Sequence, residues 1–413
     1  MQKHNTRVSR PTVPHAAPTQ TYSAQNTAGD VMGFNAKARA LAISALLTGF
    51  IATSGFAAQG IETDSVTFVQ AADTSGSRSA LTLELNAGTL AYFKQVNSQG
   101  GVHGRQLRLA TVDDGYVVKR TVELTREWIE KDAAFAFVSS IGTANAEAVL
   151  PLINAAKVPL VAPLSGAISL REPFSRNVFH IRSSYAQEVE RMVEHVLTIG
   201  ISRVAVFYDD DAFGQDVQRG VEEALARRKL KPVATGKVER GSADVTQAVR
   251  AIAAAQPQVV ICGSFGKSLV EFIKAMKATP VQPQYYALSF FTAGASIKQL
   301  GSDARGIGVT QVMPKPGAVN LPMIREFQTV MAAHAPQARL SYISLEGYLT
   351  GKVLAEGVRR AGRNLSREKF VEALEGFRNV DLGGVFLSYS PTDHSGLKRV
   401  EITVVDGGGQ VLH

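Results

Sequence analysis

The sequence contains a single cysteine, Cys262, among its 413 residues. One cysteine cannot form an intramolecular disulfide, and a zinc or iron–sulfur site built from cysteines is equally excluded. Cys262 ends an apolar run, 258–262, which indicates a small buried side chain. The eight histidines show no spacing typical of metal ligands. We therefore expect no metal site and no cofactor.

Familiar catalytic motifs are also absent from the sequence. It has no Gly-x-Ser-x-Gly nucleophile elbow, no phosphate-binding loop and no His-Glu-x-x-His. Ser165 has no partners that would complete a catalytic triad. The acidic run 209–211 lacks the spaced ligands and the glycine of a calcium loop. The sequence therefore predicts a protein that is not an enzyme.

Long apolar runs are scarce, and the one near the N-terminus has the layout of a secretory signal peptide. Lys37 and Arg39 precede the apolar stretch 40–51, and Gly55 and Ala57 place small residues at the −3 and −1 positions of a cleavage site. We predict cleavage after Ala57, with the true start at either Met1 or Met32. No cysteine follows the apolar stretch, so a lipid anchor is not expected, and we predict export to the periplasm.

The charge balance gives little support for a nucleic-acid partner. The full chain has a formal charge of +8, but residues 1–57 hold five basic residues and one acidic residue. The mature chain would carry 39 basic and 35 acidic residues, or +4. Nucleic-acid binders instead cluster basic residues on one face. No later apolar run reaches the ~18 residues that cross a bilayer, so we expect a soluble, monomeric mature protein.

Hydrophobic patterns after residue 58 predict strands and helices that alternate in two similar halves. Alternation at this spacing is typical of βαβ units and parallel sheets, so the predicted fold class is α/β with two Rossmann-like lobes. The tail 385–405 is predicted to form a β-hairpin that turns at 392–396. The expected strands are 66–71, 106–112, 135–139, 159–162, 203–208, 232–238 and 258–262, and the clearest helices are 79–97, 117–131, 144–155, 186–199 and 214–228.

The ends of the predicted strands are rich in hydroxyl groups and small residues. In open parallel sheets, ligands bind beyond the carboxyl ends of the strands. A small polar ligand held by backbone N–H and hydroxyl groups suits such a composition. The strand ends in question are 74–75, Asp113, 139–140, 163–165, 209–211 and 263–264.

The mature chain resembles the type I periplasmic substrate-binding proteins of ABC importers, in the branch that binds leucine, isoleucine, valine and related compounds. The order and spacing of several stretches carry the resemblance, which spans about 58–413. They are Val96-Asn-Ser-Gln-Gly-Gly-Val-His-Gly-Arg105, Asp113-Asp-Gly-Tyr116, Ser140-Ile-Gly-Thr143, Val158-Pro-Leu-Val-Ala-Pro-Leu-Ser-Gly166, Phe179-His-Ile-Arg-Ser-Ser-Tyr185, Val206-Phe-Tyr-Asp-Asp-Asp-Ala-Phe-Gly214 and Glu346-Gly-Tyr348.

The resemblance implies two lobes joined by a three-segment hinge, with crossings near 183–185, 306–312 and 384–388. The first lobe would contain 58–183 and 310–384, and the second 184–309 and 385–413. A ligand would be captured between the lobes and presented to an inner-membrane ABC permease. The open alternative is a sensor that presents the same closed state to a receptor or kinase.

The resemblance also implies which residues contact the ligand. Thr143 takes the place of a hydroxyl that faces the ligand carboxylate, and Ser165 and Gly166 belong to the neighbouring loop. The remaining predicted contacts are the second-lobe rings Phe213 and Phe265, the crossover residue Tyr185, and Leu81 at a position that is aromatic in leucine binders.

Ser289 marks a departure from the leucine binders, which hold the ligand ammonium with a glutamate at this place. A hydroxyl cannot replace a carboxylate that faces a desolvated ammonium. We therefore predict that α-amino acids bind poorly and that acids or amides without the amine are preferred.

Alternatives are open at several of these positions. Thr143 and Ser165 can simply cap the helices that follow them, and Phe213 and Phe265 can be core residues. Arg78 and Arg182 can pair with an anionic ligand, and Arg182 can equally form a structural ion pair near the crossover.

Overall fold

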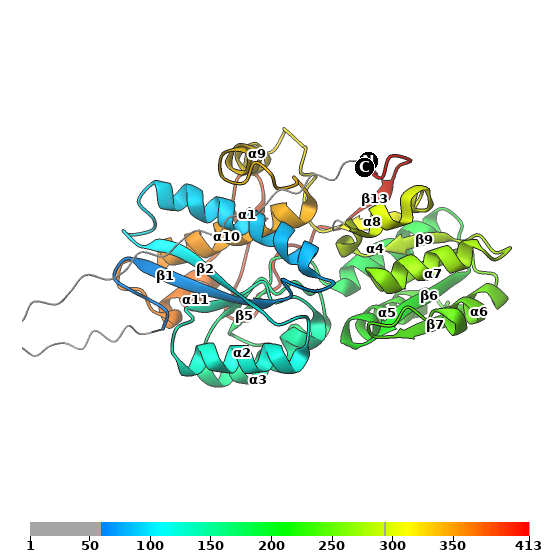
Figure 1. Ribbon diagram of the computed structural model, residues 1–413, viewed down its shortest axis with the longest axis horizontal. Helices are drawn as coiled ribbons and strands as arrows, with labels where there is room; N and C mark the ends of the chain where they lie inside the picture. Colours follow the sequence, from blue (N-terminus) through cyan, green and yellow to red (C-terminus); the bar gives the residue numbers. More distant parts are fainter. Residues whose placement is uncertain (1–58, 293–294, 413) are drawn as a thin grey trace, which may run out of the picture. The chain divides into compact units, whose positions relative to one another are not determined.

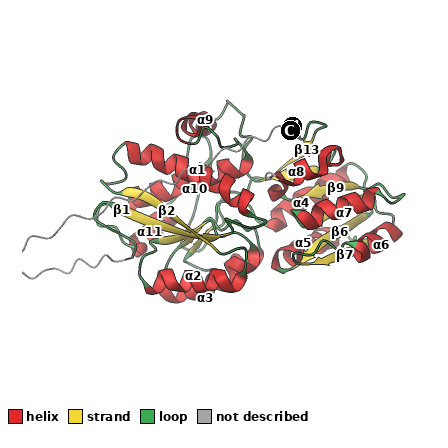
Figure 2. Cartoon of the chain, in the orientation of Figure 1, coloured by secondary structure: helices red, strands yellow, loops and turns green. Residues whose placement is uncertain are grey.

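The computed structural model describes residues 59–292 and 295–412. The predicted signal peptide and its cleavage point lie outside these residues. Helices and strands alternate along the chain, which confirms the predicted α/β class (Figure 2). The described strands form two main sheets, one of five strands and one of seven. We call the five-stranded sheet with its helices the first lobe, and the seven-stranded sheet with its helices the second lobe.

The first lobe is built on a five-stranded parallel sheet in the order β2-β1-β3-β4-β5. Its helices cover both faces, with α1 and α10 on one side and α2 and α3 on the other (Figure 1). The elements are β1 Ser65–Ala72, α1 Ser79–Ser98, β2 Gln106–Asp113, α2 Val118–Glu130, β3 Ala136–Val138, α3 Thr143–Ala156, β4 Leu160–Val161, η1 Ile168–Leu170, β5 Val178–Phe179, α9 Pro322–His334, α10 Tyr342–Ala361, α11 Arg367–Glu375, and a small pair of strands, β11 Val380–Asp381 and β12 Phe386–Leu387.

The second lobe contains a seven-stranded sheet in the order β14-β13-β10-β9-β8-β6-β7. Its strands are parallel except at the end formed by β13 and β14. The elements are α4 Tyr185–Thr198, β6 Val204–Asp210, α5 Ala212–Ala226, β7 Ala234–Glu239, α6 Thr246–Ala254, β8 Val259–Gly263, α7 Lys267–Lys277, β9 Gln284–Ala287, η2 Ser289–Thr292, α8 Ala295–Leu300, η3 Gly301–Ala304, β10 Gly308–Gln311, β13 Glu401–Val405 and β14 Val411–Leu412.

Side chains that alternate along the strands build the core on both faces of each sheet. In β1, Phe68 packs with α1 and α10, whereas Val69 packs with α3 on the opposite face. In β6, Val206 packs with α4 and α5, and Phe207 stacks on Phe272 of α7 at 3.8 Å between ring centroids. Strands buried on both faces are nearly continuously apolar, as parallel sheets require.

The predicted hairpin over 385–405 is wrong. β12 pairs with β11, and β13 pairs with β10 and β14, so the two halves of the segment belong to different sheets. The intervening segment contacts the first crossover, where Leu397 N–H donates to Ile181 O at 2.8 Å. The boundary predicted between residues 384 and 385 lies just before β12, which pairs with β11 of the first lobe. The lobe boundaries remain a proposal, in which the chain crosses for the third time between Leu387 and Glu401.

Candidate functional site

A small cavity lies where the strand ends of the two lobes meet. Its free volume is about 10 Å³, which is about the least that holds one water molecule. Five of the eight predicted site residues line it, and residues of both lobes contribute. The lining residues are Leu81, Tyr116, Ile141, Gly142, Thr143, Leu164, Tyr185, Phe213, Phe265 and Phe290.

Three hydroxyl groups meet at one end of this cavity. Thr143 Oγ1 and Ser165 Oγ lie 2.9 Å apart and share a hydrogen bond. The Tyr185 hydroxyl bonds to both; burial raises the pKa of Tyr185, while Arg182 and these two hydroxyls lower it. Thr143 is the first residue of α3, whose first N–H groups have no partner within the helix. This end of the cavity can therefore bind a carboxylate.

Thr143 does not cap a helix, whereas Ser165 bonds to the backbone of the loop that follows it. The N-cap of α3 is Gly142, and no side chain caps this helix. Ser165 Oγ instead accepts the N–H of Ala167 at 3.2 Å, which orders the loop before η1. The Thr143 hydroxyl is thus bonded to other side chains rather than to its own helix.

Gly142 and Gly166 let two aromatic rings approach the backbone. Gly142 has φ +94°, and a Cβ there would lie 2.6 Å from the Tyr116 ring. A Cβ on Gly166 would lie 2.6 Å from Cδ1 of Tyr185. Gly166 therefore positions Tyr185 but does not itself line the cavity.

The second lobe supplies an aromatic wall. The Phe213 ring packs edge-on against Tyr185 at 5.1 Å, Phe265 at 5.9 Å and Phe290 at 6.1 Å between centroids. Phe213 is 4 % exposed and belongs to the apolar cluster between the lobes. Phe213 and Phe265 thus pack in or against the apolar core and also line the cavity. Packing in the core and contact with a ligand are therefore compatible for these two rings.

Ser289 lies behind the cavity, in a buried polar network. Its N–H donates to Glu188 Oε2 at 3.0 Å, and its hydroxyl donates to Glu188 Oε1 at 3.2 Å. Arg182 Nη2 donates to Ser289 Oγ at 2.5 Å, and the Thr310 hydroxyl donates to Glu188 at 2.5 Å. The Ser289 side chain is thus committed to protein partners.

Arg182 and two carboxylates form the charged centre of this network. Arg182 Nε lies 3.5 Å from Glu346 Oε1, and both side chains are almost fully buried. Burial raises the pKa of Glu346; the charge of Arg182 lowers it and that of Glu188 raises it further. The geometry agrees with a structural ion pair for Arg182, which also lies 3.9 Å from the centroid of Phe290. Glu188 was missed from the sequence, although a carboxylate inside the apolar stripe of α4 is a usable signal.

Asp209, at the end of β6, is held by hydroxyl groups. It accepts hydrogen bonds from Ser264 at 2.7 Å and Ser268 at 2.8 Å, and burial raises its pKa to about 6. Asp211 caps α5 through the N–H of Gly214. The run 209–211 is thus used within the fold, and the described residues include no group of three or more histidine, cysteine or acidic side chains that could hold a metal.

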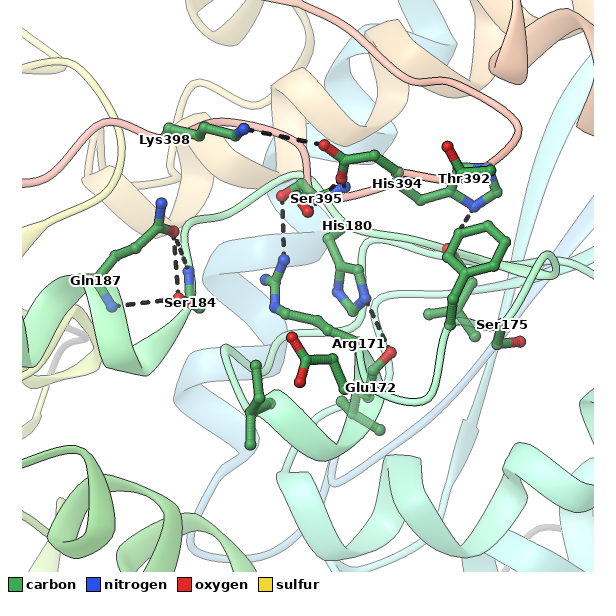
Figure 3. A pocket seen from close by; sticks show the side chains of 15 residues that line it. Arg171, Glu172, Ser175, His180, Ser184, Gln187, Thr392, His394, Ser395 and Lys398 are labelled. Atoms are coloured by element: carbon green, nitrogen blue, oxygen red, sulfur yellow. Dashed lines mark hydrogen bonds and ion pairs between the residues drawn. The ribbon is translucent and has the colours of Figure 1, made fainter. Parts of the chain in front are cut away.

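A wider cavity of about 480 Å³ lies beside the segments that connect the lobes (Figure 3). None of the predicted site residues lines it. Its polar groups largely engage one another: Arg171 Nη1 donates to Ser395 O at 3.1 Å, and the Ser184 N–H donates to Gln187 Oε1 at 2.9 Å. We therefore place the candidate site at the strand ends.

Cys262 is fully buried within β8, and burial raises the pKa of its thiol. This agrees with the interpretation as a small core side chain. None of the helices in the described part of the chain is long and apolar enough to span a membrane.

The fold and the sequence both have close counterparts among solved structures. A substrate-binding periplasmic protein from Ralstonia solanacearum is 34% identical, with a TM-score of 0.78 over 84% of this chain and 99% of that one. A possible leucine/isoleucine/valine-binding protein from Rhodopirellula baltica is 28% identical, with a TM-score of 0.80 over 85% and 96%.

A curated relative is an amino acid binding protein of Pseudomonas aeruginosa, 21% identical over 185 residues. The match spans 45% of this chain and half the length of that relative. The sequence pattern of the family described as periplasmic binding protein matches residues 65–410, nearly all of the described chain. The chain therefore belongs to the periplasmic binding protein family.

Proposed function

We propose that this protein captures a small carboxylate with an apolar or aromatic body between its lobes and presents it to an inner-membrane ABC permease. The observation that carries the proposal is the polarity of the cavity. At one end Thr143 and Tyr185 line it at the start of α3, with Ser165 bonded to the Thr143 hydroxyl, and the other lining side chains are aromatic or aliphatic. A helix N-terminus and hydroxyl groups suit an anion, and the rings suit an apolar body.

A ligand ammonium finds no carboxylate among the described residues that line the cavity. Glu188 and Glu346 are the nearby buried acids, and both are engaged with the Arg182 network. Leaving an ammonium desolvated without a partner costs about 2–5 kcal/mol. We therefore propose that acids or amides without an α-amine bind better than α-amino acids.

The nearly filled cavity implies that the ligand enters when the lobes move apart. Leu81 and Thr143 come from the first lobe, whereas Phe213, Phe265 and Phe290 come from the second. A ligand that contacts both groups is held by both only when the lobes are together, so it shifts the population toward that state. The permease would then recognise the closed form, as the transport role requires.

A thermal-shift screen tests the ligand class. The purified protein is refolded to remove carried-over ligand, and each amino acid is paired with its amine-less analogue. Leucine is compared with 4-methylpentanoate, and phenylalanine with 3-phenylpropanoate and its amide. Ligand at 100 times its dissociation constant stabilises by about 2.7 kcal/mol, which shifts the melting temperature by roughly 2–4 °C at this size.

A shift with the acids and little or none with the amino acids supports the proposal. A larger shift with leucine than with 4-methylpentanoate contradicts it, and would place this chain with relatives whose names refer to amino acids. For the transport role, deletion of the gene should abolish uptake of the identified acid by intact cells. Unchanged uptake together with a lost transcriptional response would favour the sensor role.

A further inference from the structure

Two arginines reach from one lobe onto an aromatic ring of the other. Arg78, just before α1, lies with its guanidinium carbon 3.5 Å from the centroid of the Phe265 ring. Its Nη1 donates to Phe265 O at 3.2 Å. Arg240, just after β7, lies 4.4 Å from the centroid of Tyr116, and its Nη2 donates to Tyr116 O at 3.2 Å. The two contacts are reciprocal, because each arginine belongs to the lobe opposite its ring.

Both rings line the candidate ligand cavity, but neither arginine does. A guanidinium on a ring face is attracted to the negative potential of that face. The positive charges of Arg78 and Arg240 are therefore one ring away from any ligand in the cavity. Arg182 stands in the same relation to Phe290, so three of the five aromatic rings that line the cavity contact a guanidinium.

The acids that face these arginines leave Arg78 the least compensated. Arg240 forms an ion pair with Asp211 at 3.6 Å, and Arg182 pairs with Glu346. Burial lowers the pKa of Arg78, and the charges of Asp209 and Asp211 raise it. None of the ion pairs found among the described residues includes Arg78. Its buried Nε has no hydrogen-bond partner in the described part of the chain. The Arg78 charge is thus directed toward Phe265 and the cavity beyond it.

We propose that Arg78 and Arg240 determine the charge selectivity of the site by placing positive charge behind Phe265 and Tyr116. Arg78 already lies 5.1 Å from the Tyr116 centroid within its own lobe, and the contacts of Arg78 with Phe265 and of Arg240 with Tyr116 form when the lobes are together. This inference rests on the proposed function, because it assigns the preference for carboxylates over ammonium groups to these two arginines. The arginines stabilise a bound carboxylate and repel an ammonium, although they contact neither. Because the contacts cross between the lobes, the selection acts in the closed state. A unit charge about 10 Å from the ligand carboxylate, at an effective dielectric constant of about 20, changes anion affinity on the order of tenfold.

The test compares an acid with its own uncharged amide in variants that remove the charge. Arg78→Gln and Arg240→Gln keep a planar polar group over each ring, and Arg78→Lys keeps the charge without the plane. The matched control is Arg191→Gln, because Arg191 lies on the exposed side of α4 and pairs with Glu194. Calorimetric titration uses 4-methylpentanoate and 3-phenylpropanoate, each against its primary amide, and circular dichroism checks folding.

The wild type and the Arg191→Gln variant should prefer each acid over its amide. Arg78→Gln should lower acid affinity about tenfold, and Arg240→Gln should lower it less, because Asp211 compensates part of the Arg240 charge. Both should leave amide affinity within twofold, whereas Arg78→Lys should keep most of the preference. Equal losses for acid and amide would overturn the inference, since the arginines would then only hold the lobes together. An unchanged acid-to-amide ratio in the Gln variants would overturn it as well.

Failure of the proposed function gives a different pattern. If the wild type binds neither the acids nor the amides, the proposed ligand class is wrong and the charge selection falls with it. If the wild type binds the acids but the Gln variants keep its acid-to-amide ratio, the ligand class stands and only the role of the arginines is wrong.

Discussion

Removing Arg182 should destabilise the protein more than any exposed charge does. Arg182 is 1 % exposed and lies 3.5 Å from Glu346, which is 3 % exposed. At an effective dielectric constant of about 20, this separation corresponds to a gross attraction of about 5 kcal/mol. Desolvation offsets part of it, but a lone buried charge left behind costs about 3–5 kcal/mol. We expect Arg182→Met to lower the free energy of unfolding by that amount, since Glu188 and Glu346 would then repel each other.

A double-mutant cycle separates the ion pair from simple packing. Glu346→Gln should cost much less than Arg182→Met, because it removes a carboxylate whose burial is costly, as the raised pKa of Glu346 shows, and Glu188 remains in the network to balance the Arg182 charge. The double variant should be more stable than the sum of the single effects by about 1–3 kcal/mol. Urea unfolding followed by circular dichroism measures all four proteins. The control cycle uses the exposed Arg191–Glu194 pair, where coupling should stay below about 0.5 kcal/mol.

Acidic pH provides a second readout of the same network. A carboxyl with a raised folded-state pKa contributes stability at low pH, and that contribution is lost as pH rises through the folded pKa. Without Arg182, the pKa of Glu346 should rise further. The deficit of Arg182→Met should therefore shrink as the pH is lowered. Additive single effects, or a deficit that does not change with pH, would refute the assignment of an ion pair to these residues.

Three further changes test the site and the core. Thr143→Ala should weaken carboxylate binding by about 1–3 kcal/mol in calorimetric titration, and unchanged affinity would remove Thr143 from the site. Burial raises the pKa of Asp209 to about 6, so Asp209 contributes stability that is present below about pH 4 and is lost as the pH rises through 6. Asp209→Asn should abolish this loss, which amounts to up to about 3 kcal/mol. Calorimetric melting curves of the variant that keep the wild-type pH dependence would contradict this prediction. Gly347→Ala would place a Cβ 1.8 Å from the carbonyl oxygen of Leu85, whereas a Cβ on Gly220 meets nothing closer than 3.8 Å. In urea unfolding, Gly347→Ala should cost more than about 2 kcal/mol, while Gly220→Ala should be neutral or stabilising by up to about 1 kcal/mol; similar effects of the two would show that α1 and α10 can move apart at little cost.

Most helices could be predicted from the sequence because their apolar periodicity is local. The expected helix at 186–199 is α4 at Tyr185–Thr198, and that at 79–97 is α1 at Ser79–Ser98. The hairpin failed because strand pairing is not local. β13 finds its partner in β10, where Val404 pairs with Gly308 about a hundred residues earlier in the chain. No pattern within 385–405 carries that information.

The candidate site divides in the same way. Strand ends and the family resemblance predicted Leu81, Thr143, Tyr185, Phe213 and Phe265, and the structure places these five around one cavity. Ser289 was expected at the ligand, but it lies in the Arg182 network. It bonds to Glu188 of α4 and Arg182 near the first crossover, both about a hundred residues earlier in the chain, so no local pattern around Ser289 could show where its hydroxyl would bond.

What the sequence determines by itself is the alternation of strands and helices, the parallel sheets and the family, since periodicity and motif order are properties of neighbouring residues. What only the tertiary structure decided is which charges meet. Arg182 joins Glu346 across more than 160 residues, and Arg78 and Arg240 reach rings in the opposite lobe. Electrostatic partners are chosen by distance in space and by burial, and both exist only once the chain has folded.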